Sequence, residues 1–480
     1  MLTRHRLIGL CLMAVVTAGC AGGATTTAMP VPAAAPPSVA TSARLDELEH
    51  RSFDYFWDSA NPANGLVPDR YPTPTFSSVA AVGFALSAYT IGAERGWVTR
   101  SAAAARTLTT LKFLRDLPQG DAPSGTAGFH GFFYHFLDMQ TGLRYLTNEL
   151  STIDTTLLMA GVLSGEQYYT GADATESEIR SVADTLYRRV EWDWLADSQG
   201  LVAMGWKPEV GEYPARWLGY NEAMLLYVLG IGSPTHPLQG SAWSAWTQGY
   251  ERTWRSEYGQ TYLGFPPLFG HQYSHAWIDF NGIQDAYMKS KNSDYFKNSR
   301  AATYAQQAYA AQNTLGYTGY DATVFGVTAC DGPGAMTLTI NGTPRKFYGY
   351  AGRGMGGINT YDDGTLAPTG VVSSIAFAPD IVLPAIGTLL ARYGDFLYGR
   401  YGFLDAFNPS IPDGTVVQSG RVVPGKGWVD VDYLGIDEGP IVLMIENYRS
   451  GLLWTLMRAN PYIKNGLKGA GFSGGWVDTP

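Results

Sequence analysis

Hydrophobic residues recur at helical spacing through most of the chain after Leu45. Apolar residues three and four positions apart lie on one face of an α-helix. The pattern predicts helices near residues 45–56, 78–92, 102–114, 150–161, 179–190, 217–230, 240–254, 275–288, 293–313, 370–378, 380–394 and 437–458. Strand-like segments occur between helices, notably 337–340 and 346–350, and the Asn341-Gly342 turn between these two predicts a β-hairpin.

The predicted helices have two kinds of surface. Residues 176–190 form a helix with one charged face, whereas residues 155–163 (TTLLMAGVL) and 223–229 (AMLLYVL) are apolar on nearly every side. Helices of the second kind are buried, and striped helices are peripheral. An inner and an outer layer of about twelve helices predict an all-α fold, a closed (α/α)6 barrel with long loops and the small β-hairpin at one end. The alternative is a helical solenoid, but there is no fixed repeat of about 34–47 residues.

Composition and charge narrow the class of protein. The chain has 480 residues, of which 45% are hydrophobic and 16% charged, and this excludes a disordered chain. A net charge of −9 argues against a nucleic-acid partner, which would need a basic surface. No linker interrupts residues 44–470, so we expect one catalytic domain there, acting as a monomer, followed by a Gly-rich tail over 471–480.

The first twenty residues are typical of an export signal. Arg4 and Arg6 precede a short apolar run, and Thr17-Ala18-Gly19 precedes Cys20. This pattern predicts a lipoprotein signal over 1–20 with lipid on Cys20, then an Ala/Thr/Pro-rich tether over 21–43. We therefore expect a periplasmic protein held at the outer membrane only by its lipid anchor; ordinary signal cleavage is the alternative. Cys330 remains alone, so we expect no disulfide and no Cys-based metal site.

Several familiar catalytic patterns are excluded. Residues 471–475 (GFSGG) resemble a nucleophile elbow, but no His follows in the chain, as a serine hydrolase requires. His271 and His275 stand four residues apart, but Gln272 replaces the Glu of a zincin and no third ligand is evident. Residues 352–357 (GRGMGG) lack the Lys and Ser/Thr of a phosphate loop. We expect no metal and no cofactor.

Carboxylates at the ends of apolar helices remain as candidates. Glu222 follows Asn221, a good N-cap residue, and begins the apolar segment 223–229. It could simply complement the helix dipole, which is worth about 0.3–1 kcal/mol. However, apolar surroundings disfavour the charged form of a carboxyl group, so Glu222 could stay protonated near neutral pH and act as a general acid.

Two further acids are candidates for the same site. Asp154 follows Ser151 in a capping-box pattern, so its role could be structural, but it too begins an apolar helix. Asp405 lies among aromatic residues in a loop, where it has no evident capping role. The weaker candidates are Asp437, Glu438, Asp279, Asp285, Asp362 and Asp363.

A pair of carboxylates is the minimum requirement for glycoside hydrolysis. One protonates the departing oxygen, and the other activates water or attacks the sugar. Sugar rings present apolar C–H faces that stack on aromatic side chains, and the chain has 13 Trp and 30 Tyr, although most of these fill the core. Together these features favour an exported enzyme that acts on carbohydrate.

Five segments resemble the bacterial glucoamylase-like family that corresponds to glycoside hydrolase family 144, the endo-β-1,2-glucanases. They are 217–237 (WLGYNEAMLLYVLGIGSPTHP), 269–278 (FGHQYSHAWI), 366–379 (LAPTGVVSSIAFAP), 401–409 (YGFLDAFNP) and 435–454 (GIDEGPIVLMIENYRSGLLW). The resemblance implies an (α/α)6 barrel that hydrolyses β-1,2-glucan with inversion in a deep cleft, without metal. It makes Glu222 the acid and Asp405 the base, and Asp154 an acid in the cleft that binds substrate or assists.

The same resemblance supplies candidates for substrate binding, which are Trp217, Tyr220, Asn221, His271, His275, Trp277, Phe407 and Asp437. The family often has Gln where Glu438 stands, so endo and exo action both stay open. Three other functions also remain: a polysaccharide lyase on the same toroid, a glycan-binding lipoprotein without activity, and an α-1,4-glucan hydrolase. Net charge argues against the lyase, which needs a cationic cleft for its uronate substrates.

Overall fold

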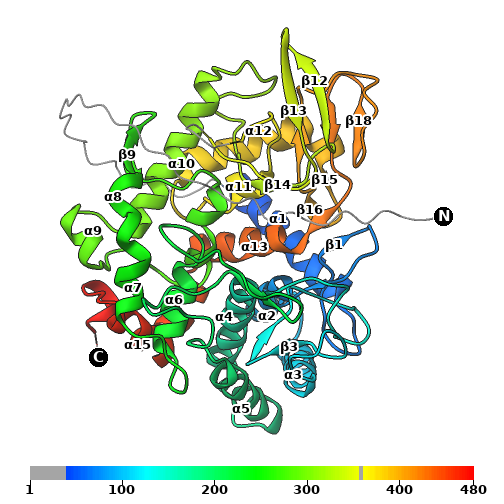
Figure 1. The fold of residues 1–480 in the computed structure, drawn as a ribbon. Coiled ribbons are helices and arrows are strands. Elements are labelled where there is room, and N and C mark those ends of the chain that lie inside the picture. The colour runs from blue at the N-terminus through cyan, green and yellow to red at the C-terminus, as the bar shows by residue number, and fades with distance from the viewer. Residues whose placement is uncertain (1–38, 356–360, 480) are drawn as a thin grey trace.

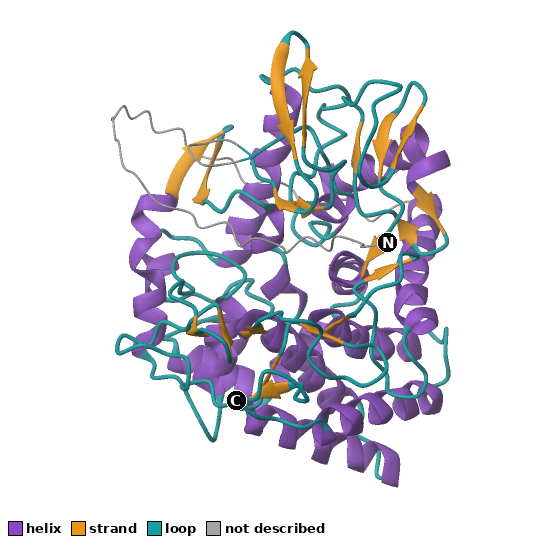
Figure 2. Ribbon diagram, turned by 45° about the vertical axis from the view of Figure 1, so that its right-hand side comes forward, coloured by secondary structure: helices purple, strands orange, loops and turns teal. Residues whose placement is uncertain are grey.

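The structure, a computed structural model, describes residues 39–355 and 361–479 (Figures 1 and 2). The predicted signal, Cys20 and most of the predicted tether lie outside these residues. The first helix, α1, begins at Val39, so residues 39–43 belong to the helical domain and not to the tether. Within the described ranges, no helix combines the length and the apolar character needed to cross a membrane.

Helices that are apolar on all sides form an inner layer, as predicted. In α2, every residue from Val79 to Gly92 is buried, and α4 and α6 are buried over most of their length. The inner elements are α2 (Val79–Glu94), α4 (Thr152–Tyr168), α6 (Met224–Gly232), the 3-10 turns η2 (Leu268–His271) and η3 (Tyr273–Ala276), α11 (Pro368–Val372) and α13 (Gly435–Arg449).

The inner elements contact one another in a closed order. The helix α2 packs on α4, α4 on α6, α6 on η3 and η3 on α13, and α13 returns to α2. The helix α11 packs on α13, and Gln272 donates to the carbonyl oxygen of Gly370 in α11 at 2.9 Å. Figure 1 shows α13 crossing the middle of the molecule above α2 and α4. The inner layer therefore surrounds a shared core.

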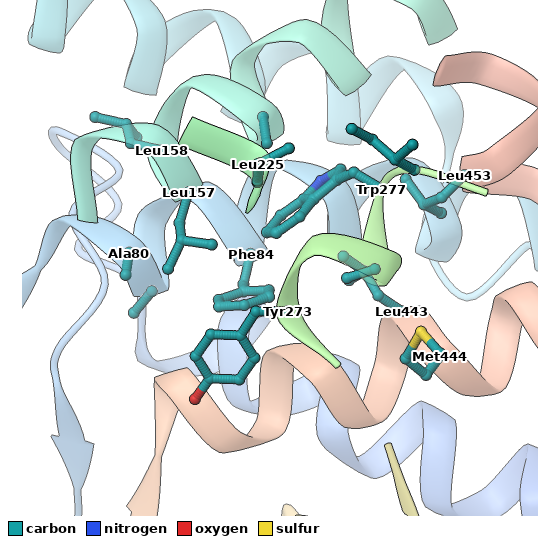
Figure 3. Close-up of a cluster of buried hydrophobic side chains, with 14 of the residues drawn as sticks. Ala80, Phe84, Leu157, Leu158, Leu225, Tyr273, Trp277, Leu443, Met444 and Leu453 are labelled. Carbon is teal, nitrogen blue, oxygen red and sulfur yellow. The ribbon is translucent and has the colours of Figure 1, made fainter. Parts of the chain in front are cut away.

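Two glycines allow α2 and α4 to approach closely. A Cβ at Gly83 would lie 2.3 Å from the carbonyl oxygen of Leu157, and a Cβ at Gly161 would lie 2.0 Å from that of Gly83. Neither position can hold a larger residue without moving a helix backbone. Beside this contact, Phe84 stacks on Trp277 in the hydrophobic core, among apolar residues from several elements (Figure 3).

Amphipathic and short helices lie outside this layer. The helix α5 shows the predicted stripe, with Ile179, Val182 and Leu186 buried and Asp173 capping its first turn. The outer elements are α1 (Val39–Ser59), α3 (Arg100–Asp116), α5 (Ala174–Arg189), α7 (Ser241–Trp246), η1 (Thr247–Gly249), α8 (Tyr250–Thr253), α9 (Ala286–Ser290), α10 (Tyr295–Gln312), α12 (Pro379–Leu397), α14 (Leu452–Ala459), α15 (Pro461–Gly469) and η4 (Gly475–Val477).

Short antiparallel strands decorate the helices. The predicted hairpin is present as β12 and β13, with Asn341 and Gly342 at φ +49° and +77°, and it projects from one end of the molecule (Figure 1). The strand pairs and small sheets are β1 (Arg70–Tyr71) with β20 (Tyr433–Leu434); β2 (Ser77–Ser78) with β5 (Phe136–Leu137); β3 (Gly128–Phe129) with β4 (Phe132–Phe133); β6 (Leu150–Ser151) with β7 (Gly205–Lys207) and β8 (Gly211–Glu212); β9 (Trp254–Glu257) with β10 (Gln260–Leu263); β11 (Ala329–Cys330) with β14 (Ala351–Gly352); β12 (Met336–Ile340) with β13 (Thr343–Phe347); β15 (Tyr398–Gly399) with β16 (Gly402–Phe403); and β19 (Gly427–Val429) with β17 (Phe407–Asn408) and β18 (Arg421–Val423).

Several predicted boundaries were wrong. The segment 217–230 is helical only from Met224, and 275–288 is a 3-10 turn, a loop and the short α9. The segment 437–458 is two helices separated at Gly451, whose φ of +70° ends the regular path of α13. The helix α15 was not predicted. The Gly-rich tail is packed, because Phe472 is buried and Trp476 donates to the carbonyl oxygen of Asp279 at 2.8 Å.

Candidate active site

Glu222 lies at the entrance to α6. Asn221 Oδ1 accepts the backbone N–H of Ala223 at 3.0 Å, which ends the preceding turn and starts the helix two residues after Glu222. The hydroxyl of Ser274 donates to the carbonyl oxygen of Glu222 at 3.1 Å, so η3 holds this backbone from the neighbouring side. The position of the Glu222 backbone is therefore fixed by two elements.

The Glu222 carboxyl group lies in an apolar environment with a negative neighbour. Its Oε2 atom is buried and has no hydrogen-bond partner. Burial, followed by the charge of Asp154, raises the pKa of Glu222 to about 7. A carboxyl group with this pKa carries a proton at neutral pH in a substantial part of the molecules and can donate it.

Asp154 lies in the first turn of α4, as predicted. Its backbone N–H donates to Ser151 Oγ at 3.2 Å, which is the N-cap interaction, and the Ser151 hydroxyl donates in turn to Asp154 Oδ2. The side chain is 7% exposed and its Oδ1 faces His135 Nε2 at 3.5 Å. Asp154 therefore serves the helix end, and its charge also acts on Glu222.

Asp405 lies in a second group of carboxylates. The backbone N–H of Asp405 donates to the carbonyl oxygen of Asp432 at 3.0 Å, and that of Asp430 donates to the carbonyl oxygen of Ala406 at 2.9 Å. These bonds place two extended segments side by side. Asp405 Oδ2 accepts the backbone N–H of Asp331 at 2.7 Å, while its Oδ1 is buried without a partner.

The carboxylates around Asp405 cannot all be ionised together. Burial, followed by the charge of Asp437, raises the pKa of Asp405 well above its usual range. Burial raises the pKa of Asp437 to about 7, and the charge of Glu438 adds to this rise. A hydrogen bond from Asp405 to the carboxylate form of Asp437 acts in the opposite direction. Asp405 and Asp437 therefore titrate as a pair that shares a proton.

A cavity of about 520 Å³ opens beside this group. Arg70 supplies the positive charge in its wall, with Nη1 2.5 Å from Asp331 Oδ2 and 4.0 Å from Asp432 Oδ2. The other lining residues are Thr73, Gly334, Ala335, Gly349, Gln418, Ser419, Gly420, Asp430 and Val431. Carboxylate, amide and hydroxyl groups around a space of this size can hydrogen-bond sugar hydroxyls.

Three of these acids also have the spacing of metal ligands. One oxygen atom from each of Asp331, Asp405 and Asp430 lies within 4.8 Å of the other two, and all three residues are buried. Hard cations such as Ca²⁺ bind oxygen sets of this kind. However, Arg70 already contacts Asp331, so part of the negative charge is neutralised without a cation.

Tyr273 connects the two groups of acids. Its hydroxyl donates to the carbonyl oxygen of Ile436 at 3.3 Å and turns out of the apolar cluster toward α13 (Figure 3). Burial, followed by the charges of Asp437, Tyr350, Glu222 and Asp154, raises its pKa well above the usual range. The Tyr273 hydroxyl is therefore fixed at the first turn of α13, and charges of both groups contribute to its raised pKa.

The predicted substrate-binding residues near Glu222 are largely enclosed. Trp217 is 8% exposed and its Nε1 donates to Thr152 Oγ1 at 2.9 Å. Tyr220 is 4% exposed and contacts the ring of His271, and Asn221 is the turn residue described above. Asp437, another of the predicted binding residues, lies buried in the first turn of α13.

Four other candidates lie in the interior and do not face the cavity. Trp277, His275, His271 and Phe407 are at most 1% exposed. Trp277 Nε1 donates to Ser87 Oγ at 2.9 Å, and His271 Nε2 and His275 Nε2 have partners at 3.1 Å. Burial lowers the pKa of both histidines to about 3, so both are neutral. In this conformation none of the four can touch a substrate, so we do not retain that prediction for them.

Sequence reasoning missed several groups at the site. They are Asp69, Arg70, His135, Tyr273, Asp331, Asp430 and Asp432. Most lie in loops or two-residue strands without a recognisable motif. One signal was present: Asp430 and Asp432 alternate around Val431 beside a strand, which directs both side chains to one face.

Comparisons with known proteins identify the family. A family model described as "Putative glucoamylase" matches residues 214–461. A crystal structure from Bacteroides uniformis with the same description is 30% identical, with a TM-score of 0.78 over 92% of this chain and 100% of that chain. The chain belongs to the glucoamylase-like family. The matched segment contains Glu222, Asp405 and Asp437 and begins after Asp154.

Two other relatives carry more specific names. An endo-β-1,2-glucanase from Chitinophaga pinensis, solved with sophorotriose and glucose, is 26% identical, with a TM-score of 0.77 over 92% of this glucoamylase-like chain and 100% of that chain. An exo-β-1,2-glucooligosaccharide sophorohydrolase (non-reducing end) from Parabacteroides distasonis is 28% identical over 457 residues. That match covers 88% of this chain but only 57% of the relative, so the chain spans little more than half of its length.

Proposed function

We propose that this chain is an inverting glycoside hydrolase that cleaves β-1,2-glucan on an (α/α)6 barrel. Glu222 is the general acid, Asp405 and Asp437 together supply the general base through the ionised member of the pair, and Asp154 assists in the cleft. The observation that carries the proposal is the Glu222 carboxyl group, whose Oε2 is buried and unpartnered and whose pKa is about 7. These are the properties that a general acid needs near neutral pH.

The reaction requires two carboxyl groups on opposite sides of the scissile bond. The Glu222 proton passes to the departing oxygen while the ionised member of the Asp405–Asp437 pair removes a proton from water. Inversion needs about 6.5–9.5 Å between acid and base, which leaves space for that water. The cavity beside Asp331 and Asp430 provides room for sugar units.

The β-1,2 linkage is proposed from the relatives. Both the Chitinophaga pinensis enzyme and the Parabacteroides distasonis enzyme are named for β-1,2-glucan chemistry, and they differ in endo or exo action. We propose endo action, with exo release of sophorose as the second candidate because of the curated relative's name. A polysaccharide lyase is disfavoured, because Asp331, Asp430 and Asp432 make the cavity acidic.

A panel of purified β-glucans tests the proposal. We expect new reducing ends only with the β-1,2-linked polymer, and products of several lengths if the action is endo. Sophorose as the sole early product would instead identify the exo mode. An ultraviolet-absorbing unsaturated product would identify a lyase, glucose from starch an α-1,4-glucan hydrolase, and tight binding without cleavage a glycan-binding protein.

We also propose export, with lipid attached at Cys20 and the domain tethered in the periplasm at the outer membrane. The basis is the charged start, short apolar run and small residues that precede Cys20. Labelling of cells with a radioactive or clickable fatty acid should mark the wild-type protein and not a Cys20→Ser variant. A labelled variant, or an unlabelled wild type, would contradict this. We propose a monomer, so sedimentation should give a mass near 52 kDa or slightly below it.

A further inference from the structure

His135 lies between two carboxylates next to the proposed acid. Its Nδ1 is 2.9 Å from Glu149 Oε1, and its Nε2 is 3.5 Å from Asp154 Oδ1. The backbone is fixed as well, because the N–H of His135 donates to the carbonyl oxygen of Glu149 at 2.8 Å. The N–H of Val79, at the start of α2, donates to the carbonyl oxygen of His135 at 3.2 Å. The imidazole ring is therefore held in a defined orientation.

Both oxygen atoms of Asp154 face groups that can donate a hydrogen bond or carry positive charge. Ser151 donates to Oδ2, and His135 faces Oδ1. Donors and positive charge favour the ionised form of a carboxyl group. By contrast, Oε2 of Glu222 has no donor. The two acids thus lie in opposite environments, because donors face both oxygen atoms of Asp154 and none faces Oε2 of Glu222.

We propose that His135 acts as a positioning residue: as an imidazolium it holds the Asp154 carboxylate in place, so that the charge of Asp154 keeps the catalytic proton on Glu222. This inference rests on the proposed function, because it assigns the proton of the same reaction. The relay runs from Glu149 through His135 to Asp154, and the charge of Asp154 then acts on Glu222. His135 itself does not touch the reacting atoms.

The charges around His135 support the imidazolium form. Burial lowers its pKa, but the charge of Asp154, the hydrogen bond and charge of Glu149 and the charge of Asp69 outweigh this and raise the pKa to about 9. Burial opposes ionisation of Glu149, yet His135 and then Lys207 lower the pKa of that carboxyl to about 2. The three carboxylates belong to α4, to the loop before β1 and to the chain before β6, so negative charge acts on the imidazole from several elements, whereas Lys207 in β7 acts on Glu149.

The pH dependence of kcat/KM tests the relay. In His135→Gln the group that holds the Asp154 carboxylate is lost, so the charge of Asp154 no longer keeps the proton on Glu222. The alkaline limb of the profile, which reports the general acid, should therefore move to lower pH by about one unit. The matched control is His130→Gln, because His130 pairs with Glu191 at 2.7 Å and stacks on Trp194 without facing a site carboxylate. Its profile should match that of the wild type. A uniform loss of activity in His135→Gln, with no shift of the limb, would overturn the proposal.

Titration of the imidazole followed by NMR gives a readout that needs no hydrolysis. In protein with ¹³C-labelled histidine, the His135 signal, assigned by its loss in His135→Gln, should titrate above pH 8. The pKa of His135 should fall by about one unit or more in Asp154→Asn, and it should also fall in Glu149→Gln. Glu149→Gln retains the imidazole, so it tests the relay even if His135→Gln folds poorly. Titration of wild-type His135 near 6.5 would overturn the relay. A high value in a protein that cleaves no glucan would leave the relay intact and refute only the proposed reaction.

Discussion

The backbone N–H of Asp331 donates to Oδ2 of Asp405 at 2.7 Å, and this bond connects β11 and the loop after it to the proposed base. The preceding residue is held firmly, because Arg353 Nη1 donates to the carbonyl oxygen of Cys330 at 2.6 Å. Arg353 is itself paired with Asp363 at 2.9 Å, and both side chains are fully buried. One oxygen of Asp405 is thus fixed by the backbone, and the carboxyl group shares a proton with Asp437.

Replacement of Asp405 should abolish hydrolysis without unfolding the protein. Asp405→Asn retains the size of the side chain but cannot accept a proton from water, so we expect kcat to fall by about 10²–10⁴-fold. Asp437→Asn should cause a smaller loss and move the pH optimum, because it removes the partner that shares the proton. Initial rates on β-1,2-glucan, with circular dichroism as the folding control, measure both effects. Unchanged rates in Asp405→Asn would transfer the role of base to Asp437 or Asp154.

Glu222→Gln should likewise lose about 10²–10⁴-fold in kcat, since the amide has no acidic proton for the departing oxygen. Glu212→Gln is a suitable control, because Glu212 is a half-exposed residue whose partner is Arg216 on the surface. A substrate with a better leaving group, such as an aryl glycoside, should recover part of the lost rate. Near wild-type hydrolysis of glucan by Glu222→Gln would show that the assigned acid is wrong.

The raised pKa values predict that the folded state loses stability as the pH rises. Glu222 and Asp437 have folded pKa values of about 7, above their ordinary values of 4.5 and 3.8. The folded state therefore binds more protons than the unfolded state, and the stability present at low pH is lost as the pH rises through 7. The raised pKa of His135 acts in the same direction between 6.5 and about 9. We expect Tm to be several degrees lower at pH 8 than at pH 5.5.

Variants identify the groups responsible for this change. Glu222→Gln and Asp437→Asn cannot titrate, so each should reduce the difference between the two Tm values. Differential scanning calorimetry at matched ionic strength measures it. A wild-type Tm that rises from pH 5.5 to pH 8 would contradict the assignment of these groups.

Removal of metal ions should leave hydrolysis unchanged. Asp331, Asp405 and Asp430 are close enough to share a cation, but Arg70 already supplies positive charge at Asp331. Rates before and after dialysis against EDTA should agree, and added Ca²⁺ should have no effect. A loss on dialysis that Ca²⁺ restores would instead make these aspartates metal ligands.

The helical layers could be predicted because the pattern of apolar residues in each helix indicates which of its faces are buried. In α2 and α4 nearly every residue is apolar or small, and in α5 the stripe is regular. The helix predicted over 275–288 was wrong, although the apolar residues of this segment have helical spacing. Asp279 Oδ1 accepts the N–H of Asn281, and Gly282 has a φ of +75°. This local turn competes with the helix, and hydrophobic spacing does not report it.

The candidate site could be predicted in part. Glu222 and Asp154 are found because they precede apolar helices, and the charge of Asp154 does raise the pKa of Glu222. Asp331 and Arg70 could not be found, because their proximity to Asp405 arises from contacts between segments far apart in the chain. The four aromatic and histidine candidates failed for another reason: a motif identifies a segment but does not say which of its side chains point inward.

Proton NMR of the first product tests the central claim most directly. When the wild-type enzyme cleaves β-1,2-glucan, we predict that the new reducing end appears first as the α-anomer and reaches the equilibrium mixture only by mutarotation, while Glu222→Gln gives no signal in the same time. A β-anomer formed first would mean retention, and no cleavage of the β-1,2 polymer by the wild type would contradict the proposed function altogether.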